Sequence, residues 1–112
     1  MGYIKHNAII VTGSEEVMDV VFKKAVELFG TKVTKPITGS NFYQTIVVVP
    51  DGSKEGWELS NEFDEWRDEF FHWVTHTTYE TRYGIDNLSS WLDIIEVRFG
   101  GDDPDSEIVR TV

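Results

Sequence analysis

The run Thr45-Ile46-Val47-Val48-Val49 is the feature that most limits how this chain can fold. All five side chains are branched at Cβ, which disfavours helix and favours a strand. The run stops at Pro50, Asp51 and Gly52, which are typical turn residues. Because the run is apolar after its first residue, it predicts a central strand that is covered on both faces or lies in a tight small core.

A polar loop follows this strand. It reads Ser53-Lys54-Glu55-Gly56 and leads directly to Trp57. The loop combines a hydroxyl group, a cation and flexible glycines with a large aromatic ring, which suits contact with a small molecule. We therefore expect Ser53, Lys54 and Trp57 to belong to a binding site.

Apolar residues recur every three or four positions between Glu15 and Phe29, which predicts an amphipathic helix. Ser14 stands where an N-cap residue is expected, and the acidic Glu15 and Glu16 suit the first turn. Gly30 is placed to end the helix in the left-handed conformation.

A second helix is expected after an N-cap at Ser60 or Asn61. Large apolar residues then share one helical face: Phe63, Trp66, Phe70, Trp73 and Val74. Aromatic side chains bury the most area per residue, so this stripe indicates core packing rather than a cofactor site.

Further strands are indicated by short runs rich in Val, Ile and aromatic residues. They cover 6–12, 32–38, 91–99 and 107–112. Pro36 limits the second of these to a sheet edge, since proline lacks the N–H that a central strand donates. The polar, weakly periodic segment 75–90 predicts a long loop.

The resulting order is strand, helix, two strands, helix, two strands, in a chain of 112 residues. It predicts one α+β domain over residues 1–112, with an antiparallel sheet of about five strands and two helices on one face. This is close to a split β-α-β arrangement with one added strand. A chain of this length buries about two thirds of its unfolded surface, enough for a core without cross-links.

The chain carries 20 acidic and 10 basic residues, a net charge of −10. Such a field repels nucleic acid and anionic lipid, so neither is expected as a partner. The absence of cysteine fits a reducing cytoplasm, and no apolar run reaches the length of about 20 residues that a membrane helix needs. An acidic protein of this kind is also suited to mimic nucleic acid towards a protein partner.

No set of residues in the sequence forms a recognisable catalytic or cofactor motif. His72 and His76 are four residues apart on the second predicted helix, with Glu65 and Glu69 on the same side, but a firm third metal ligand is missing. We therefore expect a protein that is not an enzyme and holds no metal or cofactor.

The few arginines are informative in so acidic a chain. Guanidinium groups bind phosphate in a bidentate manner and stack on rings. Together with Lys54 and four rings they could clasp a small nucleotide; the set is Arg98, Arg110, Phe42, Trp57, Tyr83 and Trp91. For any single arginine the simpler alternative is a cross-strand ion pair with Glu96 or Glu107.

Three segments resemble a family of small proteins of tailed bacteriophages: Y-I-K-H-N-A-I-I-V-T at the start, V-P-D-G-S-K-E-G-W-E-L-S in the middle and I-I-E-V-R-F-G-G-D-D-P near the end. The resemblance covers nearly the whole chain, and P-D-G-S-K-E-G-W is its most specific part. Within this family the chain looks similar to the anti-Thoeris sponges, whose action is like that of anti-CBASS proteins.

This resemblance implies a phage anti-defence protein that sequesters a cyclic nucleotide immune signal without degrading it. The signal would be of the cyclic ADP-ribose type, or a cyclic oligonucleotide. The resemblance further implies a homo-oligomer in the cytoplasm of the infected bacterial host.

Two other functions stay open. The first is an acidic phage protein that inhibits a host nucleic-acid-binding protein as a nucleic-acid mimic, using these carboxylates: Glu62, Asp64, Glu65, Asp102, Asp103 and Asp105. The second, a phage enzyme acting on nucleotides, ranks last because no catalytic set is visible.

Overall fold

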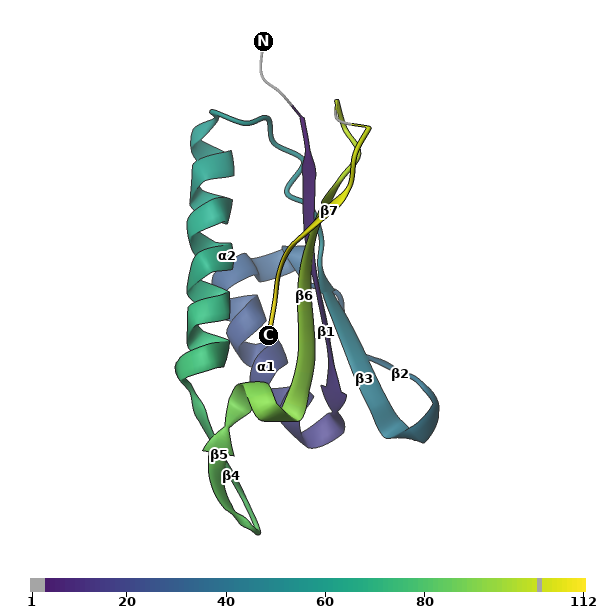
Figure 1. Cartoon of the computed structure of the whole chain (residues 1–112), viewed down its shortest axis with the longest axis vertical. Helices are drawn as coiled ribbons and strands as arrows, with labels where there is room; N and C mark the ends of the chain where they lie inside the picture. The colour runs from purple at the N-terminus through teal and green to yellow at the C-terminus, as the bar shows by residue number, and fades with distance from the viewer. Residues whose placement is uncertain (1–3, 103) are drawn as a thin grey trace.

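The computed structural model describes residues 4–102 and 104–112, so Tyr3 and Asp103 of the sequence motifs lie outside the described residues. Its main layer is an antiparallel five-stranded sheet in the order β2-β3-β1-β6-β7. The strands are β1 His6–Ser14, β2 Ile37–Thr38, β3 Tyr43–Val48, β6 Leu92–Phe99 and β7 Glu107–Thr111. Helices α1 (Glu15–Phe29) and α2 (Glu58–His76) pack on the same side of it (Figure 1). The predicted α+β fold is thus confirmed.

The two helices make interleaved crossovers. Helix α1 connects β1 to β2, and β3 lies between these two strands; α2 connects β3 to β6, and β1 lies between them. This is the split β-α-β arrangement, with β7 added at the β6 edge. Neither helix in the described part of the chain combines the length and apolar character needed to cross a bilayer.

The core lies between the sheet and the helices. Ile46 and Val48 of β3 point into it and are buried, whereas Thr45 and Val47 lie half-buried on the other face. The apolar run is therefore covered by helices on one face only. Strand β3 pairs with β2 on one side and β1 on the other, so it is an interior strand of the sheet as expected, next to the middle strand β1.

Helix α2 begins at Glu58, earlier than the predicted cap at Ser60 or Asn61. Trp57 takes the N-cap position with an extended backbone, and its carbonyl accepts a bond from the Asn61 N–H at 3.1 Å. Glu58 favours this start, because a carboxylate in the first turn interacts well with the helix dipole. The predicted aromatic stripe packs as expected, with Phe63 and Phe70 buried and both tryptophans half-buried against the core.

The segment 75–90 is not the predicted irregular loop. It completes α2 and forms a separate two-stranded sheet, β4 (Thr78–Thr81) with β5 (Gly84–Asn87), followed by a 3₁₀ turn at Leu88–Trp91. Threonine and tyrosine favour strands, and Gly84 takes the positive φ of 126° that the tight turn requires. Leu88, which is fully buried, anchors the hairpin to the core.

The ends of α1 differ in detail from expectation. Ser14 holds the N-cap position, but its side chain makes no capping hydrogen bond. Gly30 ends the helix with φ 59° and ψ −123°, a glycine conformation outside the left-handed helical region. Its N–H still bonds to the Val26 carbonyl and so closes the last turn.

Gly101 lies where the β6–β7 turn passes the start of the chain. A Cβ atom there would lie 2.2 Å from the Ile4 carbonyl oxygen, whereas at Gly100 the nearest atom is a His6 ring carbon at 3.3 Å. The Asp102 N–H donates to the same Ile4 oxygen at 2.7 Å, so the backbone of Ile4 is held in place.

Gly101→Ala should therefore destabilise the fold more than Gly100→Ala, by at least about 1 kcal/mol. Both glycines have φ 65°, so the backbone strain of a new side chain is the same and the difference reports the clash. Urea unfolding of both variants measures it. Equal losses of stability would contradict the close approach.

Candidate functional site

The eight residues proposed from the sequence as ligand contacts do not converge on one place within the chain. Ser53, Lys54, Trp57 and Arg98 lie at the end of the sheet where β3 leads into α2. Phe42 precedes β3, and Tyr83 and Trp91 belong to the hairpin region at the opposite end, in a molecule 53 Å long (Figure 1). Arg110 lies on β7 and faces α2. A single clasp from all eight is therefore not formed in one chain.

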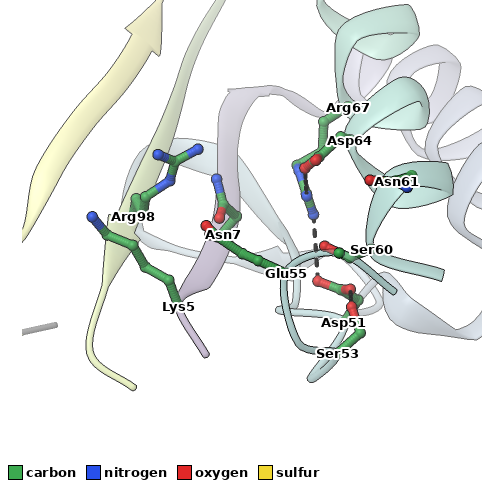
Figure 2. Close-up of a pocket in the computed structure, with 11 residues that line it drawn as sticks. Lys5, Asn7, Asp51, Ser53, Glu55, Ser60, Asn61, Asp64, Arg67 and Arg98 are labelled. Atoms are coloured by element: carbon green, nitrogen blue, oxygen red, sulfur yellow. Dashed lines mark hydrogen bonds and ion pairs between the residues drawn. The ribbon is translucent and has the colours of Figure 1, made fainter. Parts of the chain in front are cut away.

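A polar cavity of about 230 Å³ opens at the β3–α2 end. Figure 2 shows Lys5, Asn7 and Arg98 along the strands, Arg67 and Asp64 on α2, and the loop of Asp51–Glu55 closing it. Two of the predicted contact residues, Ser53 and Arg98, line this cavity. Trp57 lies on the same loop, 52 % exposed.

A second cavity, of about 280 Å³, adjoins the first between α2 and strands β6 and β7. Both cavities are lined by Asp64, Arg67 and Arg98, and the second also reaches Arg110. We call the two together the basic groove, because four of the chain's ten basic residues line it: Lys5, Arg67, Arg98 and Arg110. Five carboxylates also line it, so charges nearly balance here in a chain with twice as many acidic as basic residues: Asp51, Glu55, Asp64, Asp68 and Glu96.

Arg67 is the most constrained cation of the groove. It comes from the buried face of α2 and is only 3 % exposed. It bonds to Asp64 one turn away, and its Nη1 lies 3.6 Å from an Asp51 carboxylate oxygen and makes no hydrogen bond to any described residue. Guanidinium nitrogens are strong donors, so this one has unused hydrogen-bonding capacity, although a ligand oxygen reaches it only if a neighbouring side chain moves.

Arg98 has a similar unfilled donor. Its Nη1 contacts Glu107 across the β6–β7 pair at 3.4 Å, while its Nε is buried and has no hydrogen-bond partner among the described residues. Arg110 pairs with Glu96 in the same cross-strand manner at 2.7 Å. The predicted cross-strand ion pairing with Glu107 and Glu96 is therefore confirmed for both arginines.

Glu96 holds the floor of the groove together. Its side chain is 2 % exposed and accepts hydrogen bonds from Asn7 at 2.8 Å and from Arg110 at 2.7 Å, with Arg67 Nε at 3.7 Å. Arg110 also reaches Asp68 on α2 at 2.7 Å and covers the Phe71 ring. This network fixes α2 against the sheet and orients the arginines before any ligand arrives.

The loop beside the groove is held by its own contacts. Ser53 donates to Asp51, and Lys54 forms an isolated bridge with Ile4. The Lys54 ammonium lies 5.8 Å from the Trp57 ring centroid, within cation–π range. Glu55 is exposed, and its side chain extends across the cavity towards Asn7 (Figure 2).

Arg67 was not among the ligand contacts predicted from the sequence. The signal was its position: it falls four residues after Phe63 and three before Phe70, on the stripe assigned to the core. A charged residue at a core position is rarely buried without a partner, so this pattern could have pointed to the network.

The opposite end carries an aromatic cavity of about 440 Å³. It contains Tyr83 and Trp91 from the predicted set, and Tyr79 and Arg82 from the hairpin. The Trp91 and Tyr79 rings lie 6.5 Å apart, and Arg82 lies over Tyr83. Phe42 is 80 % exposed and lines a further surface hollow with Asn41.

The two histidines of α2 stack on each other, with ring centroids 3.9 Å apart. His76 Nδ1 lies 2.9 Å from the His72 carbonyl oxygen. Within residues 4–102 and 104–112, no three His, Cys, Asp or Glu side chains are grouped to hold a metal ion.

Searches of family models, curated proteins and solved structures returned no match for this chain. Membership of a phage protein family therefore stays a prediction.

Proposed function

We propose that this protein binds and sequesters a small phosphate-bearing molecule in the basic groove. The observation that supports it is the pair of buried guanidinium nitrogens, Arg67 Nη1 and Arg98 Nε, that make no hydrogen bond within the described chain. Phosphate oxygens accept charge-assisted hydrogen bonds from guanidinium groups, and a dry, pre-oriented pair of arginines gives such bonds their full value.

The groove's size restricts what part of a ligand it takes. Its two cavities, about 230 and 280 Å³, are each smaller than the roughly 300–1,000 Å³ of pockets that enclose drug-sized ligands. A phosphate–ribose portion fits, and a base would lie outside, where the exposed Trp57 offers a stacking surface.

The ligand class follows from the resemblance to phage sponges. It favours a cyclic ADP-ribose-type signal, or a cyclic oligonucleotide, that is held and released unchanged in the cytoplasm of an infected bacterium. Sequestration requires only aromatic rings and cations in fixed positions. The groove contains the cations, and the neighbouring loop contains the Trp57 ring.

The first experiment is a thermal-shift screen against cyclic ADP-ribose isomers and cyclic di- and trinucleotides, with inorganic phosphate as the reference anion. A ligand at 100 times its Kd, bound only by the folded protein, should add about 2.7 kcal/mol of stability. Chromatography of the ligand released on heating completes the test. Intact ligand supports sequestration, altered ligand indicates an enzyme, and no shift with any nucleotide contradicts the proposal.

Variants then locate the site. Arg98→Ala should weaken binding by about 1.5–3 kcal/mol and Trp57→Ala by about 1–3 kcal/mol. Glu55→Gln should strengthen it, because the change removes a negative charge that extends over the cavity. Arg82→Ala, which removes an arginine at the opposite end, is the matched control. Unchanged affinity in both Arg98→Ala and Trp57→Ala would place the ligand elsewhere.

A second candidate function rests on the outer side of α2. Glu58, Glu62, Glu65 and Glu69 follow one another at helical spacings of four, three and four, so they form one line of carboxylates. Such a line of negative charge complements the positively charged cleft in which a nucleic-acid-binding enzyme holds its substrate. If nucleotides produce no shift, capture of such a protein that is lost in Glu62→Lys/Glu65→Lys would support this mimic.

A further inference from the structure

The face of the sheet turned away from the helices carries almost no charge. Strand register and alternation assign to this outer face Ile37 on β2; Thr45 and Val47 on β3; His6, Ala8, Ile10 and Thr12 on β1; Asp93, Ile95, Val97 and Phe99 on β6; and Ile108 and Thr111 on β7. In a chain with 27 % charged residues, this face has one carboxylate, Asp93, at its end. An uncharged, β-branched sheet face is typical of a surface that is covered.

Nothing in the described chain covers this face. Both helices lie on the other side of the sheet (Figure 1). Large apolar side chains remain open to solvent on it: Ile10 is 38 % exposed, Phe99 39 %, Ile108 62 % and Ile37 69 %. The Thr12 and Thr45 hydroxyls of this face lie 2.8 Å apart and form a hydrogen bond with each other.

The face is large enough for a specific contact. The five strands have between two and nine residues, and at about 3.4 Å by 4.8 Å for each residue they span a plane of about 500 Å². This is within the roughly 300–600 Å² of the largest apolar patch on a typical monomer. The relief of the side chains adds to the area and brings it closer to the roughly 800 Å² per partner of a standard interface.

We infer that a second copy of this chain packs its outer face against this one, so that two sheets form a sandwich about 10 Å thick between outward-facing helices. A two-fold contact needs a surface that fits itself, which flat rows of Ile, Val and Thr provide without any need for matching charges. Two chains of −10 repel each other, and a face whose one carboxylate lies at its end lets them meet with little burial of like charges.

The same charge pattern argues against a different protein as the occupant. A partner selected by so acidic a chain would be attracted through carboxylates, and Asp93 is the single carboxylate assigned to the outer face. The basic groove lies on the helix side of the sheet, so pairing of the outer faces and ligand binding can be tested independently.

Sedimentation velocity on the wild-type protein is the first test. The expected species has twice the chain mass of 12.9 kDa at micromolar concentration. Added salt should strengthen the dimer, since salt screens repulsion between like-charged copies and leaves an uncharged contact intact. A wild-type protein that stays monomeric up to about 100 µM at high salt would overturn the inference.

The variant Ile10→Lys should weaken dimerisation by at least about 100-fold, because the two-fold axis brings two unpaired ammonium groups into one apolar contact. Val20→Lys on α1 is the matched control: Val20 is 37 % exposed, against 38 % for Ile10, and the change in net charge is the same. It should leave the dimer unchanged.

Ile108→Lys on β7 gives a second route if Ile10→Lys fails to fold; circular dichroism checks the fold of each. Dimers that survive folded Ile10→Lys and Ile108→Lys, or that dissociate equally in Val20→Lys, would show that copies meet elsewhere and overturn the assignment of this face.

Discussion

Replacing Glu96 with alanine should lower the free energy of unfolding by about 3–5 kcal/mol. The substitution leaves Arg67 and Arg110 facing a buried gap where their shared carboxylate was, and it leaves the Asn7 amide without its acceptor. Breaking a buried ionic network costs this much because the remaining groups stay buried with part of their compensation lost; Arg67 keeps Asp64 and Arg110 keeps Asp68. Urea unfolding followed by tryptophan fluorescence measures the loss.

Two variants separate charge from shape. Glu96→Gln keeps the size and an oxygen for Asn7 but loses the negative charge, so it should fall between the wild type and Glu96→Ala. Glu107→Ala removes a carboxylate that is 53 % exposed and pairs with Arg98, and it should cost no more than about 1 kcal/mol. Similar losses for Glu107→Ala and Glu96→Ala would mean that Glu96 has no special role.

Phe70→Ala should be comparably damaging, at about 3–5 kcal/mol. Phe70 is fully buried and packs edge-on against Phe29, with ring centroids 5.8 Å apart, and beside Trp73 at 6.2 Å. Its removal leaves a cavity where α1, α2 and the sheet meet, and a cavity adds to the lost burial of the ring. The midpoint of urea unfolding should fall with little change in slope.

The matched control is Phe42→Ala, since Phe42 is 80 % exposed. This change should alter stability by no more than about 0.5 kcal/mol. If Phe70→Ala and Phe42→Ala lowered the free energy of unfolding equally, the assignment of Phe70 to the core would be wrong.

Sequence patterns predicted the elements that bury one face. Helix α1 was predicted with its observed bounds, because apolar spacing and a terminal glycine agreed on them. The β4–β5 hairpin was missed, since its strands have four residues each and β5 is exposed throughout, so no apolar alternation marks them. Apolar periodicity in a sequence reflects burial of one face, so a hairpin that is exposed on both faces shows little periodicity.

The candidate site was predicted only in part, and strand direction explains the error. Phe42 precedes β3 and Ser53 follows it, so a six-residue strand of about 20 Å separates them. Trp91 likewise precedes β6, whereas Arg98 lies near the far end of that strand. Residues at opposite ends of one strand cannot contact the same small ligand within one chain. Their chemistry alone had suggested a common ligand. The role of Arg67 could not be predicted from helical spacing alone, because it depends on how closely α2 packs against the sheet.

The position of β1 in the middle of the sheet has a consequence for how the chain folds. Its second neighbour is β6, so His6 pairs with Phe99 and Gly13 with Leu92, near opposite ends of the sequence. Pairings so distant in sequence slow folding, and mixed helix-and-sheet domains fold at rates between those of helical bundles and all-β domains. During synthesis, at about 5–20 residues per second, the edge of β1 that pairs with β6 stays open until residues 92–99 have left the ribosome. The middle of the sheet is therefore completed only after about 80 further residues have followed β1.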